Sequence, residues 1–127
     1  MTIDILVVDD DPGVRGVLRR FLSEKGYSVA TAEDGETALR MIRESAPDVL
    51  LIDVYLPGIS GIDVLYTLEH EGRGVPTLAF SGMPDDEMAR ETMLMGADDF
   101  ILKPFDFGAL EASLLPKLAA MGFPSPS

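Results

Sequence analysis

Five short apolar runs, each followed by a segment with helical periodicity, most limit the folds open to this 127-residue chain. The runs are rich in Val, Ile and Leu, and they read "DILVVD", "YSVATA", "VLLID", "TLAFS" and "FILK". Such runs are typical of strands that are covered on both faces. Strict alternation of strand and helix predicts right-handed crossovers and a parallel sheet between two layers of helices. We therefore predict a doubly wound α/β fold.

The helical segments carry apolar residues at spacings of three and four. The first of them shows the pattern most clearly, at Val14, Val17, Leu18, Phe21 and Leu22. The fourth has Met88, Met93 and Leu94 as its apolar residues. Pro116 falls inside the fifth, where its missing N–H predicts a kink or the end of that helix near Leu115.

Topology predicts where a functional site would lie. Five strand–helix units most often form the flavodoxin-like sheet with strand order 2-1-3-4-5, which leaves a crevice at the carboxyl ends of strands 1 and 3. Asp9 and Asp10 end the first apolar run, and Asp53 ends the third. We therefore expect these carboxylates, which lie far apart in the sequence, to meet at one edge of the sheet.

Composition narrows the chemistry available at that edge. The 22 acidic residues outnumber the 10 basic ones and give a net charge of −12, which disfavours direct binding of nucleic acid. There is no cysteine and only one histidine, so a bound metal would be held by oxygen. No apolar run is long enough to span a bilayer and no signal peptide is evident, so we expect no membrane association and a cytoplasmic location.

Carboxylates crowded into a crevice repel one another unless they are protonated or a cation neutralises them. Mg²⁺ prefers oxygen ligands and commonly binds one or two carboxylates together with phosphate oxygens. The alternative is that these acids are loop residues or helix caps. Asp11 fits that alternative, because it directly precedes Pro12, a residue favoured in the first turn of a helix. Asp53 fits it poorly, because an uncompensated charge at the end of the run "VLLI" would be costly.

Two further polar residues are expected at the same edge. Ser81 ends the fourth apolar run and Lys103 ends the fifth. A hydroxyl and an ammonium placed beside Asp53 can hold the oxygens of a phosphoryl group. Taken singly, Ser81 could be a turn hydroxyl and Lys103 a solvated charge, but their coincidence at one edge favours a functional role.

The motifs "LVVDDD", "LLIDVYLPGISG", "LAFSG" and "GADDFILKPF" occur in an order and spacing that resemble the receiver domains of two-component response regulators, of the chemotaxis-regulator type. The resemblance covers Ile3 to Leu115. It implies a receiver domain over residues 1–120, followed by a flexible tail or the start of a linker over 121–127.

The resemblance also implies roles for individual residues. Asp53 would be the phosphoacceptor and would take its phosphoryl group from a phosphohistidine. Asp9, Asp10 and Asp53, with the backbone carbonyl of Tyr55, would bind Mg²⁺. The phosphoryl oxygens would contact Ser81 and Lys103, and the Lys103–Pro104 bond would be a cis peptide.

Signalling in this family would follow from a shift of the Ser81 hydroxyl and an inward turn of Phe100, which changes the surface of the fourth helix, fifth strand and fifth helix. The partners implied are a sensor histidine kinase or a histidine phosphotransfer protein, and a downstream effector or output domain. On this reading the protein is a phosphoacceptor switch that assists its own phosphorylation and dephosphorylation, and not an enzyme acting on an external substrate.

Two alternatives remain at the level of sequence. An aspartyl-phosphate hydrolase would share the acidic residues and the sheet, but it usually carries a second Asp two positions after the nucleophile, where this chain has Tyr55. A pseudo-receiver that serves only as a docking module would lack some of the functional side chains, and all of them are present here.

Overall fold

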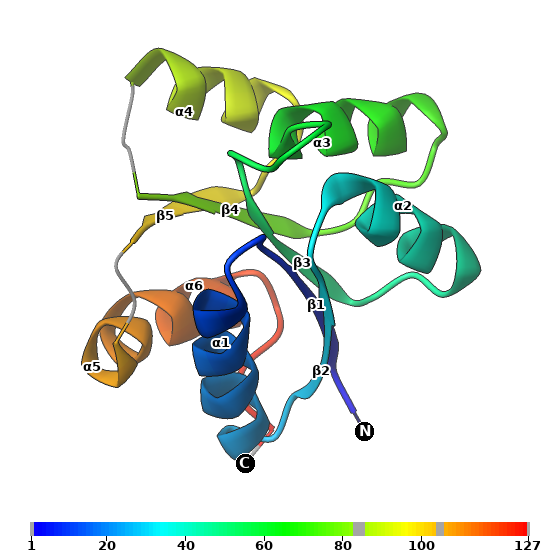
Figure 1. The fold of residues 1–127 in the computed structure, drawn as a ribbon. Helices are drawn as coiled ribbons and strands as arrows, with labels where there is room; N and C mark the ends of the chain where they lie inside the picture. Colours follow the sequence, from blue (N-terminus) through cyan, green and yellow to red (C-terminus); the bar gives the residue numbers. More distant parts are fainter. Residues whose placement is uncertain (1, 83–85, 104–105, 127) are drawn as a thin grey trace.

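The computed structural model describes residues 2–82, 86–103 and 106–126. Five parallel strands form one sheet in the order β2-β1-β3-β4-β5, as predicted (Figure 1). Their bounds are β1 (Asp4–Val8), β2 (Ser28–Ala32), β3 (Val49–Asp53), β4 (Thr77–Ser81) and β5 (Asp99–Leu102). The sheet therefore has the doubly wound, flavodoxin-like arrangement that places the ends of β1 and β3 side by side.

Helices cover both faces of the sheet (Figure 1). One layer contains α2 (Gly35–Glu44), α3 (Gly61–His70) and α4 (Asp86–Leu94). The other layer contains α1 (Pro12–Glu24) and a helical stretch made of α5 (Phe107–Ala109), the π-helical turn η1 (Leu110–Leu114) and α6 (Leu115–Ala120). All connections thus run from a strand into a helix and back, as the alternating pattern predicted.

The apolar runs are buried on both sides because alternate residues of a strand point to opposite faces. In β1, Leu6 and Val8 belong to the hydrophobic cluster beneath α2 and α3. Ile5 and Val7 belong to the second cluster, beneath α1 and α6. This two-sided burial explains why the central strands read as continuous aliphatic runs and not as an alternation of apolar and polar residues.

The start of α1 is capped by the residue that the sequence indicated. The Asp11 side chain accepts a hydrogen bond of 2.8 Å from the amide of Gly13, and Pro12 occupies the first turn. This satisfies one of the amide groups that have no partner inside the helix. The prediction that Asp11 is a helix cap is confirmed.

The buried face of α4 differs from the predicted one. Met88 and Thr92 are buried, whereas Met93 and Leu94 are 41% and 74% exposed. Thr92 can be buried because its hydroxyl donates a 2.8 Å hydrogen bond to the carbonyl of Met88, one turn earlier. A threonine whose hydroxyl is hydrogen-bonded within its own helix can be buried like an apolar residue. The pattern of apolar residues alone did not predict this.

Pro116 does not end the last helix. The helical stretch continues to Ala120, and the turn before the proline widens into a π-helix in which the amide of Leu115 bonds to the carbonyl of Leu110. A proline ring clashes with the carbonyl four residues earlier in a regular α-helix, and a π turn relieves that conflict. Pro116 therefore changes the helix near Leu115, as predicted, but the change is one wide π-helical turn and the helix continues beyond it.

Residues after α6 lie against the turn between α1 and β2. The amide of Phe123 donates to the carbonyl of Leu118, and the carbonyl of Phe123 accepts a 2.6 Å hydrogen bond from the Tyr27 hydroxyl. The Ser125 hydroxyl donates to the carbonyl of Lys25. Phe123 and Ser125 therefore lie beside the end of α1 (Figure 1). The domain boundary at residue 120, and the flexible tail or linker over 121–127, stay predictions.

Candidate functional site

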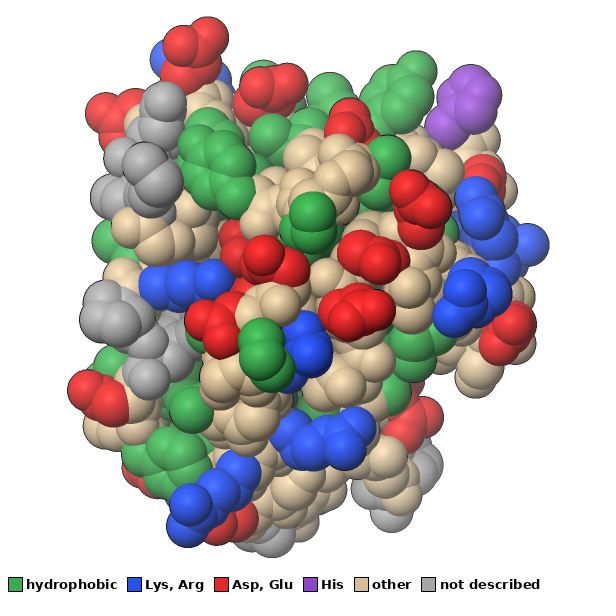
Figure 2. Space-filling model, viewed as in Figure 1, with side chains coloured by type: hydrophobic (Ala, Val, Ile, Leu, Met, Phe, Trp, Pro, Cys, Tyr) green, Lys and Arg blue, Asp and Glu red, His purple; other side chains and the backbone are tan. Residues whose placement is uncertain are grey.

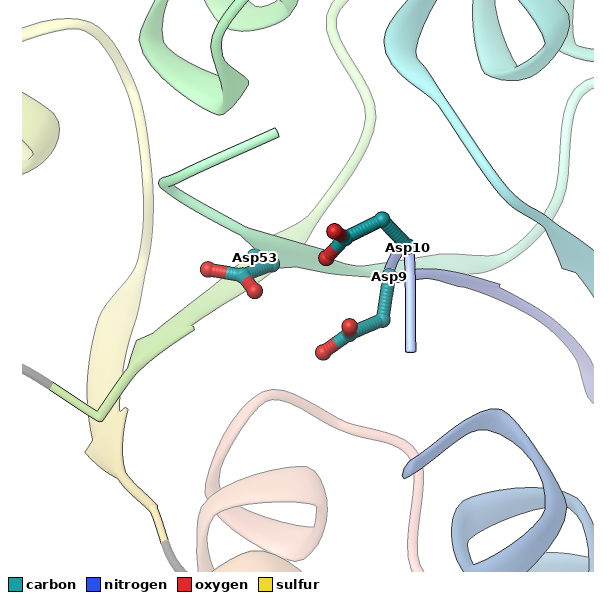
Figure 3. A group of neighbouring side chains, drawn as sticks. All are labelled: Asp9, Asp10 and Asp53. Atoms are coloured by element: carbon teal, nitrogen blue, oxygen red, sulfur yellow. The ribbon is translucent and has the colours of Figure 1, made fainter. Parts of the chain in front are cut away.

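The predicted carboxylates meet at the carboxyl edge of the sheet. Asp9 and Asp10 follow the end of β1, and Asp53 is the last residue of β3 (Figure 3). One oxygen from each side chain lies within 4.8 Å of one from each of the others. Asp9 is fully buried and Asp53 is 4% exposed, whereas Asp10 is exposed. Parallel pairing of β1 with β3 thus produces the convergence expected from topology.

Lys103, which directly follows β5, brings a positive charge to this cluster. Its ammonium nitrogen lies 2.9 Å from Oδ2 of Asp53 and 2.7 Å from Oδ2 of Asp9. The backbone of Lys103 is held in place because its amide donates a 2.9 Å hydrogen bond to the carbonyl of Ser81. The lysine predicted at this edge therefore bridges two of the three carboxylates.

The second oxygens of Asp9 and Asp53 are held by backbone amides. Oδ1 of Asp9 accepts a 2.8 Å hydrogen bond from the amide of Asp11. Oδ1 of Asp53 accepts a 2.9 Å bond from the amide of Tyr55. These two local bonds fix the direction in which each side chain presents its second oxygen to Lys103.

Burial and charge act in opposite directions on the ionisation of this group. Burial raises the pKa of Asp53 and outweighs the hydrogen bonds from Lys103 and Tyr55 and the charge of Lys103; the neighbouring charge of Asp9 adds to the increase. Burial disfavours the charged form of Lys103, but bonds and attraction from Asp9 and Asp53 together outweigh it and raise the pKa of Lys103. The lysine stays charged beside the Asp53 carboxylate, which burial makes costly to ionise.

The donor set fits a hard divalent cation. Oδ2 of Asp9 is buried, and its contact among the described residues is the Lys103 ammonium, 2.7 Å away. A buried carboxylate oxygen that already faces one cation is suited to face a second. With Asp10 and Asp53 beside it, the cluster offers several carboxylate oxygens and no nitrogen or sulfur, which suits Mg²⁺.

Acidic side chains extend around the cluster. Figure 2 shows Asp and Glu side chains gathered near the middle of the face that looks onto the carboxyl ends of the strands, with Lys and Arg side chains more scattered around them. This arrangement agrees with the net charge of −12 and attracts cations to the site.

The structure places the other predicted site residues at or near the same edge. Ser81 ends β4 and is buried. Phe100 lies in β5, is partly buried and packs against the core beneath α2 and α3. The Tyr55 side chain is 50% exposed. The roles of Ser81 and Phe100 in switching, and of the Tyr55 carbonyl as a ligand, stay predictions. Pro104 lies outside the described residues, and so does the predicted cis peptide.

Gly61 supports the site in a way that the sequence did not reveal. A Cβ atom at this position would lie 2.3 Å from the carbonyl oxygen of Asp53 and 2.9 Å from Cα of Val54. The first residue of α3 therefore packs directly onto the backbone that carries Asp53. The close approach depends on how α3 folds back over β3, which the residues around Gly61 do not show by themselves.

Arg15 is a second residue that sequence reasoning missed. Its guanidinium reaches back from α1 and donates a 2.8 Å hydrogen bond to the backbone carbonyl of Asp9. Arg19 and Arg20 follow on the same helix, so the sequence offers no signal that separates Arg15 from ordinary surface arginines.

A family model described as the response regulator receiver domain matches residues 5–115. The chain belongs to this family. The match covers most of the chain and runs from the second residue of β1 through the π-helical turn. The family assignment agrees with the sheet order and with the acidic edge described above.

Curated relatives support the same assignment for this receiver. Response regulator MprA of Mycobacterium tuberculosis is 42% identical over 121 residues, which cover 95% of this chain and 51% of that protein. The protein of the same name from Mycobacterium ulcerans is 41% identical, and 50% of it is covered. The chain thus spans about half the length of the curated relatives it matches.

Solved structures agree with the fold of the receiver. The chemotaxis protein CheY4 of Vibrio cholerae has a TM-score of 0.82 at 28% identity, with 90% of this chain and 97% of that chain covered. A two-component response regulator of the LuxR family from Aurantimonas has a TM-score of 0.82 at 30% identity, with 94% and 87% covered. Separately, none of the helices in the described residues is long and apolar enough to cross a membrane.

Proposed function

We propose that this receiver accepts a phosphoryl group on Asp53 and uses it as a switch. The observation that carries the proposal is the placement of Asp53 at the end of β3, within reach of Asp9, Asp10 and the Lys103 ammonium. This combination joins a nucleophilic carboxylate, a set of cation ligands and a fixed positive charge at one edge. The donor would be a phosphohistidine on a sensor kinase or a histidine phosphotransfer protein.

In the transfer, an oxygen of the Asp53 carboxylate forms a bond to phosphorus while the phosphorus–nitrogen bond of the donor breaks. The electron pair of the broken bond stays on the imidazole nitrogen of the donor. Mg²⁺ bound by Asp9, Asp10 and Asp53 would neutralise the charge of the phosphoryl oxygens. The Lys103 ammonium and the Ser81 hydroxyl would hold those oxygens, and the carbonyl of Tyr55 would complete the ligand set.

Lys103 would also change its partners when Asp53 is phosphorylated. Its ammonium pairs with both Asp9 and Asp53 and lies within 3 Å of an oxygen of each. Once a phosphoryl group occupies Asp53, the same ammonium would turn to the phosphoryl oxygens. The change in its partners would accompany the movement of Ser81 and Phe100, and the surface of α4, β5 and α5 would carry the signal to an effector or output domain.

The hydrolase alternative receives no support at this site. Tyr55 stands where such an enzyme would carry a second Asp as its general acid, and its side chain is 50% exposed. We therefore propose that the chain assists only its own phosphorylation and dephosphorylation.

Incubation with acetyl phosphate and Mg²⁺, followed by intact-mass measurement, tests the proposal. The wild-type protein should gain the mass of one phosphoryl group, and chelation of Mg²⁺ should prevent the gain. Asp53→Asn should gain nothing. Asp34→Asn is a matched control, because it removes one carboxylate charge at the start of α2 while Asn can still cap the helix. A wild-type protein that gains no mass, or an Asp53→Asn variant that gains it equally, contradicts the proposal.

A further inference from the structure

We propose that Arg15 is a positioning residue for the magnesium site and that its loss weakens Mg²⁺ binding, an inference that rests on the proposed function. Arg15 lies in the first turns of α1 and contacts the backbone of Asp9, whereas Lys103 contacts its side chain. Its side chain is partly buried and donates a 2.8 Å hydrogen bond from Nη1 to the backbone carbonyl of Asp9.

The Asp9 backbone leaves the sheet at this point and needs partners of its own. Its amide still bonds to the carbonyl of Ala32, at 3.2 Å, at the end of β2. Its carbonyl, which follows the last paired residue of β1, is bonded to Arg15. Arg15 therefore holds the carbonyl of the Asp9–Asp10 peptide, just where the chain turns to present Asp10.

A loop of contacts connects Arg15 to the side chains of the cluster. The Arg15 amide donates to the carbonyl of Asp11, and the Asp11 amide donates to Oδ1 of Asp9. The Arg15 guanidinium then closes the loop at the Asp9 carbonyl. The first turn of α1 and the acidic turn thus form one unit. Groups that orient metal ligands from behind commonly change metal affinity by tenfold or more when they are removed.

The sign of the effect separates positioning from simple electrostatics. Arg15 is a cation close to an acidic cluster, so its charge opposes the approach of Mg²⁺. If the charge were all that mattered, its removal would tighten Mg²⁺ binding. If the hydrogen bond to Asp9 positions the ligands, its removal weakens binding in spite of the lost charge.

Isothermal titration with Mg²⁺ alone tests the inference on the full chain. Arg15→Met keeps the aliphatic stem but loses the donor and the charge, and we expect its dissociation constant for Mg²⁺ to rise about tenfold. Arg19→Met removes the same charge one turn further along an exposed part of α1, and we expect equal or slightly tighter binding. Arg15→Lys, whose ammonium can reach the same carbonyl, should recover most of the affinity.

The outcomes are distinguishable. If Arg15→Met binds Mg²⁺ as tightly as the wild type, or more tightly, the inference is overturned and the proposed function stands. If the wild type binds no Mg²⁺, the proposed function fails and the inference fails with it. If Arg15→Met does not fold, the Lys variant decides: binding within about threefold of the wild type supports the inference, and a tenfold loss overturns the role of a single donated bond.

Discussion

The Lys103 ammonium nitrogen lies 2.9 Å from Oδ2 of Asp53. The two residues are 50 positions apart in the sequence, and the pairing of strands in the sheet brings them together. The same nitrogen lies 2.7 Å from the buried Oδ2 of Asp9. One cation therefore serves two carboxylates that have little access to water. The consequences of removing it differ from those of removing an ordinary surface charge, because the carboxylates would be left buried together.

We expect Lys103→Met to destabilise the metal-free protein by about 2 kcal/mol, since it leaves Asp9 and Asp53 without their cation. Added Mg²⁺ should restore more stability to this variant than to the wild type, because a bound cation replaces the missing charge. Urea unfolding with EDTA and with Mg²⁺ measures both effects. Lys117→Met is the control, because its partner Asp99 lies outside the acidic cluster. Equal stability of Lys103→Met and the wild type in EDTA would contradict this expectation.

Gly61→Ala should be among the most damaging small substitutions, because the added methyl group would lie 2.3 Å from the carbonyl of Asp53. Backbone must move to admit it, and we expect a loss of about 3 kcal/mol in the free energy of unfolding. Gly16→Ala is the matched comparison, because an added Cβ in α1 meets nothing within 4 Å. That change should stabilise the protein by about 1 kcal/mol. Urea unfolding of the two variants should therefore give shifts of opposite sign.

The Lys117–Asp99 pair should make stability depend on acid pH. Burial opposes ionisation of Asp99, but the bond from Lys117, the amide of Phe100 and the charge of Lys117 outweigh it, so the pKa of Asp99 is lowered from 3.8. The stabilisation is therefore complete above pH 3.8 and is lost as the pH falls through the lower folded value. Lys117→Met should cost about 0.5 kcal/mol at neutral pH, since both side chains are partly solvated.

Urea unfolding at several pH values measures the difference between the wild type and Lys117→Met. That difference should shrink below pH 3.8. Arg19→Met is the control, because Arg19 has no ion-pair partner in the part of the chain that the structure describes. A difference that stays constant through the acid range would argue against the Asp99 contact.

Tyr27→Phe removes the hydroxyl that bonds to the carbonyl of Phe123 at 2.6 Å. Because Tyr27 is buried, we expect a loss of about 1 kcal/mol in the free energy of unfolding. The amide of Phe123, which bonds to Leu118, should exchange with solvent severalfold faster. Tyr66→Phe is the control, because that side chain is 58% exposed. Unchanged exchange at Phe123 would show that the C-terminal contact is held by other groups.

The order of the strands and the position of the acidic edge could be predicted because both follow from local patterns. The runs "VLLID" and "TLAFS" coincide with β3 and β4 residue for residue. Alternation of strand and helix then leaves few topologies, and the ends of β1 and β3 must be neighbours in the expected one.

Other features could not be predicted because they depend on contacts between distant elements. Lys103 can contact both Asp9 and Asp53 only if the ends of β1, β3 and β5 lie close together. Predicting this contact would require the positions of all three strand ends. The buried face of α4 depends on Thr92 satisfying its hydroxyl within the helix. The bond from Arg15 to Asp9 depends on the conformation of the Arg15 side chain. The sequence has three arginines in α1 and gives no reason to choose one of them.

The π-helical turn at Leu110–Leu114 has a consequence for any molecule that contacts the last helix. A wide turn holds one more residue than an α-helical turn. The buried side chains Leu110, Leu114 and Leu118 nevertheless follow one another at spacings of four, so one apolar stripe runs through the wide turn and past Pro116. A partner that contacts the exposed side of this helix would therefore meet residues from before and after the proline on one face.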